Sequence, residues 1–192
     1  SSITGGEDVG GGDRDVLNFS IANDAVTITF DGAESGSYAD DDGDSGTFSQ
    51  IENYQLTSGN DSVNASLDTS GVTIDGNGGM DTIIGGSGND IITGSPYSDN
   101  IMGGDGNDKV DGGTQIAPAT DKGRDVFEIR LTAADQTTAQ ALLSKIKVVP
   151  SDDTNYTWMV QRLNDAGAVV ETDYLINVEA VNISINQTGT NK

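Results

Sequence analysis

The chain has 192 residues, of which 31 are acidic and 9 basic, so its formal net charge is -22. This charge repels nucleic acids and anionic membranes and attracts cations. Cysteine and histidine are both absent, which removes disulfides, Ser-His-Asp and Cys-His catalysis and the usual zinc sites. Only 34% of residues are hydrophobic, and no apolar run approaches the roughly 18 residues of a membrane span. Composition therefore fits disorder or a repeat fold held together by more than apolar burial.

Residues 1–57 are expected to form an N-terminal β segment. Apolar and polar residues alternate cleanly in AVTITF, which indicates a half-buried strand. Two flanking stretches, DVLNFS and TFSQIENYQL, also favour strands. The expected strands cover residues 15–20, 25–30 and 47–56.

An acidic stretch, residues 31–46, separates the second and third of these strands. Asp40, Asp42 and Asp44 match the first three ligand positions of an EF-hand calcium loop. The match then fails, because Ser45 stands where that loop needs glycine and no glutamate closes it. We expect a solvated acidic loop, with an additional calcium site as the alternative.

A nine-residue repeat occupies the middle of the chain. Two copies are nearly perfect and two are worn: 85–93 (GGSGNDIIT), 103–111 (GGDGNDKVD), 76–84 (GNGGMDTII) and 94–102 (GSPYSDNIM). Four aspartates lie nine residues apart, each followed two positions later by an aliphatic residue: Asp81, Asp90, Asp99 and Asp108, then Ile83, Ile92, Ile101 and Val110. Ordinary Asp-Gly and Asn-Gly turns do not require such a phase, so a chance run of turns is the weaker interpretation.

The pattern G-G-x-G-x-D-x-U-x is that of RTX (repeats-in-toxin) proteins, and the chain resembles this family over about residues 56–128. The resemblance implies an all-β fold, a parallel β-roll or β-helix in which two units complete one turn of a flattened coil. Glycines allow the tight loop of each unit, and its aspartate adds a charged oxygen of the kind that calcium binds. The middle residue of the short strand that follows points into the core.

In this family calcium lies between two loops stacked on the same side, held by both aspartates and by loop carbonyls. Carried over to this sequence, the best-formed site joins Asp90 and Asp108. The carbonyls that complete it come from Gly85, Ser87, Gly104 and Gly106. Several calcium ions are implied along the coil.

On the other side of the coil, the resemblance pairs Asp81 with Asp99. Gly76 and Gly78 supply the glycine positions of the Asp81 loop. Pro96 and Tyr97 replace the third and fourth positions of the Asp99 loop, and the fourth is normally glycine. We therefore expect this site to be distorted or weak.

Imperfect copies of the repeat occur before and after these four units. SGNDSVN, residues 58–64, places Asp61 for pairing with Asp81. KGRDVFE, residues 122–128, places Asp125 for pairing with Asp99, although TQIAPATD lengthens the preceding loop. GGGDRDVLN offers Asp15 as a weaker candidate. The calcium-binding roll is accordingly assigned to residues 58–128.

Residues 129–192 differ in composition and are expected to cap the open end of the coil. A helix is predicted from Thr132 to Ile146, followed by a short strand ending at Pro150. NDAG indicates a hairpin between two strands, and a last alternating strand follows; these cover residues 156–163, 168–176 and 177–185. Packing within this cap is a better interpretation of Tyr156 and Trp158 than a sugar-binding platform.

The sequence thus predicts a noncatalytic calcium-binding protein that folds when it binds the ion. The resemblance implies type I export from a bacterium as an unfolded chain, and folding outside the cell. One interpretation is a surface-layer, adhesin, matrix or filament protein that self-associates or binds cell-surface polysaccharide or protein. The alternative is a noncatalytic RTX module of a larger secreted enzyme or toxin; a freestanding polysaccharide lyase is disfavoured because no catalytic constellation is present.

Overall fold

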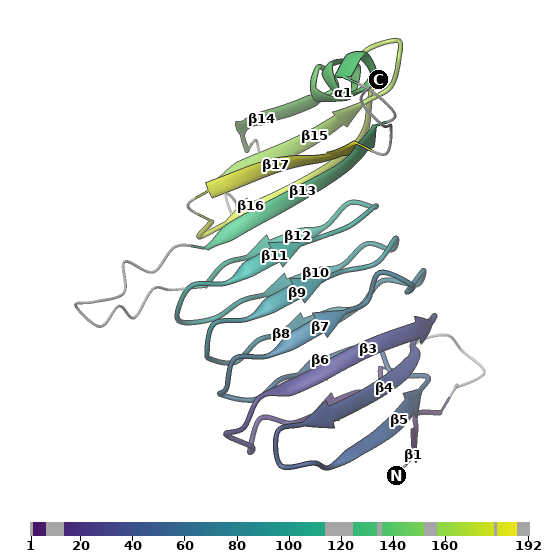
Figure 1. The fold of residues 1–192 in the computed structure, drawn as a ribbon, viewed down its shortest axis with the longest axis vertical. Helices are drawn as coiled ribbons and strands as arrows, with labels where there is room; N and C mark the ends of the chain where they lie inside the picture. The colour runs from purple at the N-terminus through teal and green to yellow at the C-terminus, as the bar shows by residue number, and fades with distance from the viewer. Residues whose placement is uncertain are drawn as a thin grey trace.

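The computed structural model describes residues 2–6, 14–113, 125–133, 136–151, 157–178 and 180–187. Two β-sheets face each other along an elongated molecule, with the termini at opposite ends (Figure 1). The nine-stranded sheet has the order β1 (Ser2–Thr4), β5 (Ser45–Ser49), β4 (Ser35–Asp40), β3 (Val26–Gly32), β7 (Ser62–Asn64), β9 (Thr82–Ile84), β11 (Asn100–Met102), β13 (Val126–Ala133), β17 (Ala180–Gln187). The eight-stranded sheet has the order β14 (Ile146–Pro150), β15 (Trp158–Leu163), β16 (Val169–Ile176), β12 (Lys109–Asp111), β10 (Ile91–Thr93), β8 (Thr73–Asp75), β6 (Asn53–Gln55), β2 (Val16–Asn18).

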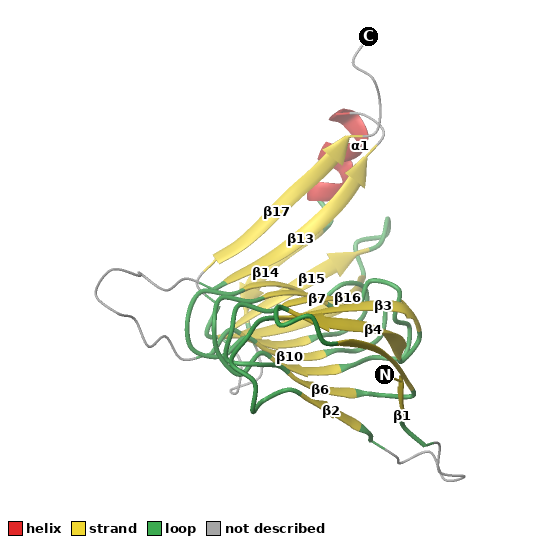
Figure 2. Cartoon of the chain, turned by 60° about the horizontal axis from the view of Figure 1, so that its bottom comes forward, coloured by secondary structure: helices red, strands yellow, loops and turns green. Residues whose placement is uncertain are grey.

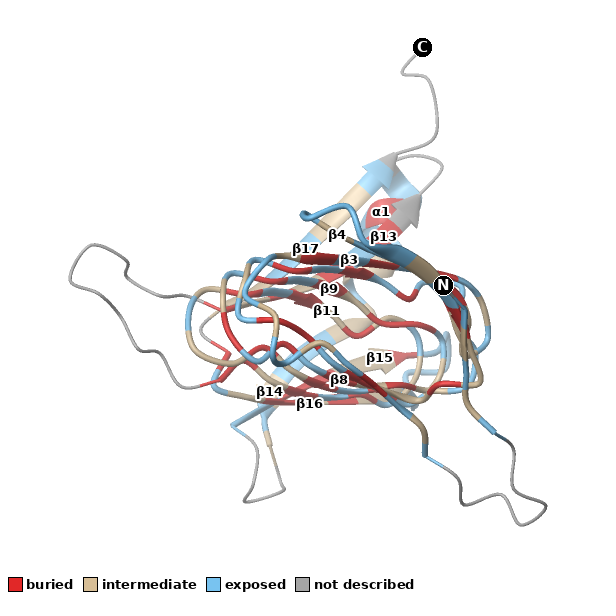
Figure 3. Ribbon diagram, turned by 90° about the horizontal axis from the view of Figure 1, so that it is seen from below, coloured by how far each residue is buried: buried red, intermediate tan, exposed pale blue. Residues whose placement is uncertain are grey.

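The middle of the molecule is a parallel coil that alternates between the sheets, so the predicted β-roll is confirmed. Its strands are three residues long, and the central residue of each is buried between the sheets (Figure 3). Parallel register stacks these residues: Val63, Ile83 and Ile101 align in one sheet, and Tyr54, Ile74, Ile92 and Val110 in the other. The apolar core is therefore narrow: each strand contributes one inward side chain, and these side chains stack in one row per sheet.

An antiparallel meander closes the N-terminal end of the nine-stranded sheet. β3 pairs with β4 and β4 with β5, so the expected acidic loop at 31–46 is wrong. The strand predicted over 47–56 is also wrong as a single element, because Gln50 turns the chain at a φ of 59° between β5 and β6. Phe30, Phe48 and Tyr54 pack there with ring centroids 5.1–5.4 Å apart. This aromatic cluster fills the end of the coil.

The C-terminal cap combines long strands with one short helix. β13 runs beyond the coil and pairs in parallel with β17, while β15 and β16 form the predicted hairpin (Figure 2). The helix α1 spans Gln136–Leu143 and packs against β13 and β17. The predicted helix start at Thr132 is wrong, because β13 keeps Thr132 and Ala133 in register with β17. Eight residues of strand pairing outweigh the local capping signal.

Cap strands also replace coil strands in both sheets. β16 continues the eight-stranded sheet beside β12, and β17 continues the other sheet beside β13. Within the described part of the chain, no helix is long and apolar enough to cross a membrane. The domain boundaries at 57 and 128 stay a prediction.

Candidate metal centre

The loops of the coil place six aspartates in two columns, one on each side. The first aspartate column contains Asp61, Asp81, Asp99 and Asp125, each directly before a strand of the nine-stranded sheet. The second aspartate column contains Asp90 and Asp108, directly before β10 and β12. All six are at most 2% exposed. The structure thus brings together every aspartate pair that the repeat spacing predicts.

One backbone hydrogen bond repeats along both columns. The N–H of each aspartate donates to Oδ1 of the next, at 2.9 Å from Asp61 to Asp81 and 2.8 Å from Asp81 to Asp99. The bond continues at 2.8 Å from Asp99 to Asp125, and at 2.9 Å from Asp90 to Asp108 in the second column. Each hydrogen bond therefore holds a carboxylate against the preceding turn of the coil. It also brings the negative charges of consecutive aspartates close together.

Glycines let the loops approach closely enough to surround these carboxylates with carbonyl oxygens. A Cβ at Gly85 would overlap the Gly103 carbonyl oxygen and Oδ2 of Asp90, and one at Gly76 would overlap the Gly94 carbonyl oxygen. Gly104 has a φ of +110°, so it also needs glycine for its backbone conformation.

The remaining predicted loop positions differ in how strictly they need glycine. Gly106 has a φ of +124° and lies against the Gly88 carbonyl oxygen, whereas a side chain at Gly78 would meet nothing closer than 3.8 Å. Ser87 donates its N–H to the Asp68 carbonyl at 3.0 Å. The need for glycine therefore differs from position to position within these loops.

The loop of the worn copy 94–102 keeps the backbone conformation of the repeat, although it has side chains at two positions that are normally glycine. Ser95 and Tyr97 have φ values of 90° and 103°, where the matching loop has Gly104 and Gly106 at 110° and 124°. Non-glycine residues in this region cost about 1–3 kcal/mol each. The backbone conformation thus survives at a cost in strain, and Asp99 stays in its column.

Among the residues that the structure describes, three buried carboxylate oxygens have no hydrogen-bond partner. They are Oδ2 of Asp81, Asp99 and Asp108. The ion pairs of the described residues use Arg130, Lys145 and Arg162, and none of these pairs includes Asp81, Asp99 or Asp108. An ionised carboxylate without a partner is costly in a protein interior, so these oxygens call for a bound cation.

Burial also shifts the protonation of these groups. Loss of water contact raises the pKa of Asp81 to about 8, of Asp99 and Asp108 to about 7, and of Asp90 to about 6. Neighbouring aspartates add to the increase at Asp81 and Asp108. The charged columns are thus unfavourable at neutral pH without a compensating ion.

The donor set fits calcium. It consists of carboxylate and backbone carbonyl oxygens, which hard divalent cations bind in sets of six to eight. Among the described residues, no three acidic side chains converge as a metal-holding group. Carbonyls must therefore supply much of the coordination, as the glycine-lined loops allow.

Other acidic residues lie outside this pattern. Asp15 donates its N–H to Oε2 of Glu52 at 2.7 Å, one turn before the repeat proper. Asp68 is fully buried and accepts bonds from Ser70 and Gly71, so it holds its own loop together. Val72 takes the aspartate position before Asp90 and donates its N–H to Asp90 Oδ1 at 2.9 Å. The second column therefore begins at Asp90.

Sequence reasoning missed Asp173, on β16. Its Oδ1 accepts the Asp108 N–H at 3.3 Å, and the side chain is 3% exposed. A local signal exists, because Asp173 precedes the buried Leu175 by two residues, the spacing of Asp90 and Ile92. The nine-residue spacing, however, does not continue across the 65 residues that separate Asp108 and Asp173.

Two stacked columns of buried aspartates between glycine loops define a calcium-binding parallel β-roll. A family model described as the RTX calcium-binding nonapeptide repeat, in four copies, matches residues 75–96 and 93–115. Residues 75–115 are therefore RTX calcium-binding repeats, and these repeats bind several calcium ions. None of the curated proteins matches the chain.

Acidification is expected to weaken calcium binding. The raised pKa values of Asp81, Asp99 and Asp108 mean that protons stabilise the folded calcium-free chain. That stabilisation is present below the unfolded pKa of about 4 and is lost as pH rises through the folded values. Calcium needs the ionised form, so adding calcium should contribute less folded structure as pH falls through these values, because protons then stabilise the calcium-free fold.

Circular dichroism with calcium and with chelator, between pH 6 and pH 8, measures this change across the range of these pKa values. A gain in structure on adding calcium that stays constant over the range would show that protons do not replace the ion at the buried aspartates.

Proposed function

We propose that this chain is a noncatalytic, extracellular structural module that folds when calcium binds between its stacked loops. The partnerless oxygens of Asp81, Asp99 and Asp108 are the observation that carries the proposal. Secretion by a bacterium would suit such a protein, because calcium is plentiful outside the cell. Circular dichroism in calcium and in chelator tests the folding part.

The proposed ligands follow the aspartate columns. In the second column, Asp90 and Asp108 share an ion with carbonyls from Gly85, Ser87, Gly104 and Gly106. In the first column, the pairs are Asp61 with Asp81, Asp81 with Asp99 and Asp99 with Asp125, with carbonyls from Gly76 and Gly78. Asp61 and Asp90 already accept protein hydrogen bonds at both carboxylate oxygens, so they should contribute less than their neighbours.

We further propose that the module belongs to a surface layer, adhesin, matrix or filament. β1 and β2 end the two sheets on the N-terminal side, and edge strands add strands from other chains unless they are blocked. Bound calcium would lower the negative charge that keeps chains apart. β4, β5 and β1 extend the nine-stranded sheet past β3, whereas β2 directly ends the coil in the eight-stranded sheet. The β2 edge is therefore the better docking point.

Light scattering in calcium tests this assembly. The apparent mass is expected to rise with protein concentration in calcium, and to rise less for Val16→Lys, which charges an exposed position on β2. Asp42→Lys, at the exposed turn between β4 and β5, is the matched control. A strict monomer at high concentration would favour the alternative, a noncatalytic module of a larger type I-secreted enzyme or toxin.

A further inference from the structure

β16 of the cap occupies the place where the next calcium loop of the coil would lie. It pairs in parallel with β12, with Lys109 opposite Tyr174 and Val110 opposite Leu175. This register sets Asp173 beside Asp108, as the coil register sets Asp108 beside Asp90. Asp173 thus extends the second aspartate column, 65 residues further along the chain.

Two hydrogen bonds of the loop stack are repeated at this junction. Between the loops, the Asn107 N–H donates to Asn89 Oδ1 at 2.9 Å, and the Asp90 N–H donates to Asp108 Oδ1. At the cap, the Thr172 N–H donates to Asn107 Oδ1 at 2.8 Å, and the Asp108 N–H donates to Asp173 Oδ1. Thr172 and Asp173 therefore stand where a further loop would place its Asn-Asp pair.

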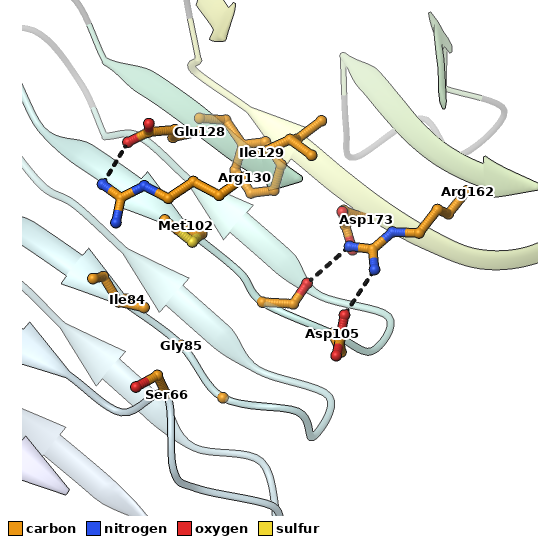
Figure 4. A pocket seen from close by; sticks show the side chains of 13 residues that line it. Ser66, Ile84, Gly85, Met102, Asp105, Glu128, Ile129, Arg130, Arg162 and Asp173 are labelled. Carbon is orange, nitrogen blue, oxygen red and sulfur yellow. Dashed lines mark hydrogen bonds and ion pairs between the residues drawn. The ribbon is translucent and has the colours of Figure 1, made fainter. Parts of the chain in front are cut away.

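The charge of Arg162 stabilises ionised Asp108 and Asp173 from a distance, but Arg162 forms no ion pair with either of them. Arg162 forms an ion pair with Asp105 Oδ1 at 2.7 Å and donates to the Gly104 carbonyl oxygen (Figure 4). It also forms an ion pair with Glu171 Oε1 at 2.8 Å. Its ion pairs therefore leave out the two buried carboxylates, Asp108 and Asp173. Asp108 is fully buried, and its Oδ2 has no hydrogen-bond partner.

Space and further oxygen donors lie beside Asp173. Asp173 lines a pocket together with Gly85, Gly104, Asp105 and Arg162 (Figure 4). Burial and the charge of Asp108 raise the pKa of Asp173 to about 8, which is the direction expected for a carboxylate that lacks a cation.

We propose that a calcium ion binds between the last loop of the coil and the cap, held by Asp108 and Asp173. This inference rests on calcium binding by the coil and adds a site in which one ligand comes from a strand outside the repeats. The ion joins the cap to the coil, so docking of the hairpin β15–β16 depends on calcium. Arg162 holds the outer side of the same junction through Asp105 and Glu171.

Calcium counting at saturation tests the site with the full chain and calcium alone. Asp173→Asn keeps the shape of the side chain and is expected to bind one ion fewer than the unmodified chain. Asp165→Asn is the matched control, because Asp165 lies in the exposed turn of the same hairpin. An unchanged ion count for Asp173→Asn would overturn the proposal.

Trp158, the only tryptophan, reports separately on the cap, because it lies on β15 opposite Leu175 of β16. For Asp173→Asn, the calcium midpoint of its fluorescence should rise by about tenfold or more, the usual scale for loss of a group that supports a metal. Circular dichroism of the coil should still respond to calcium. If neither signal responds in the unmodified chain, the general calcium proposal fails instead.

Terbium, which replaces calcium in oxygen sites, makes the test independent of whether Asp173→Asn folds. Terbium emission excited through Trp158 is expected in the unmodified, terbium-folded chain, because the proposed ion lies at the neighbouring strand. Absence of this emission from a folded, terbium-loaded chain would overturn the cap site even if the coil binds the metal.

Discussion

Removal of calcium is expected to convert the chain from a β-roll to a largely disordered state. The coil buries one inward side chain per short strand, while eight described aspartates are at most 3% exposed. The net charge of -22 adds repulsion along the molecule. Ion binding to the folded state must offset these costs, as it does in small metal-dependent domains.

Far-ultraviolet circular dichroism in excess chelator, and after calcium is restored, measures this transition. Magnesium is the control cation, because its smaller octahedral shell suits carbonyl-rich loops poorly, and it should restore little β-structure. A spectrum that chelator leaves unchanged, in protein already stripped of metal, would contradict calcium-dependent folding.

Loss of an inner column aspartate is expected to have the second largest effect. Asp99 lies between Asp81 and Asp125, and its Oδ2 is one of the partnerless oxygens. Asp99→Asn removes charge from two neighbouring ion positions, so the calcium midpoint for folding should rise by at least about tenfold. Asp42→Asn changes an exposed carboxylate in the turn between β4 and β5 and should leave the midpoint unchanged.

Folding in chelator separates a metal ligand from a structural residue. Without calcium, Asp99→Asn removes a buried charge, so the variant should gain at least as much structure as the unmodified chain at neutral pH. A structural role would instead predict lower stability in both conditions. Equal calcium midpoints for Asp99→Asn and Asp42→Asn would show that the principal sites lie elsewhere.

The repeat region was predictable because its information is local and periodic. Each unit carries its own turn glycines, aspartate and inward aliphatic residue, and each contacts the unit 18 residues away, as Asp90 contacts Asp108. A fixed separation of this kind can be read directly from spacing. The spacing identified the RTX pattern, and the resemblance then implied the fold class, the stacked aspartates and the inward-facing Ile83, Ile92, Ile101 and Val110.

The ends of the coil were decided by contacts that spacing does not encode. β4 forms within an acidic stretch because it pairs on both sides, and α1 starts late because β17 holds the end of β13 in a sheet. Asp173 joins its column across 65 residues, after the nine-residue phase has been lost. The sequence by itself determined how each turn folds on the next, because that pairing repeats. Only the tertiary structure determined what closes the stack, since closure depends on single, non-repeating contacts between distant strands.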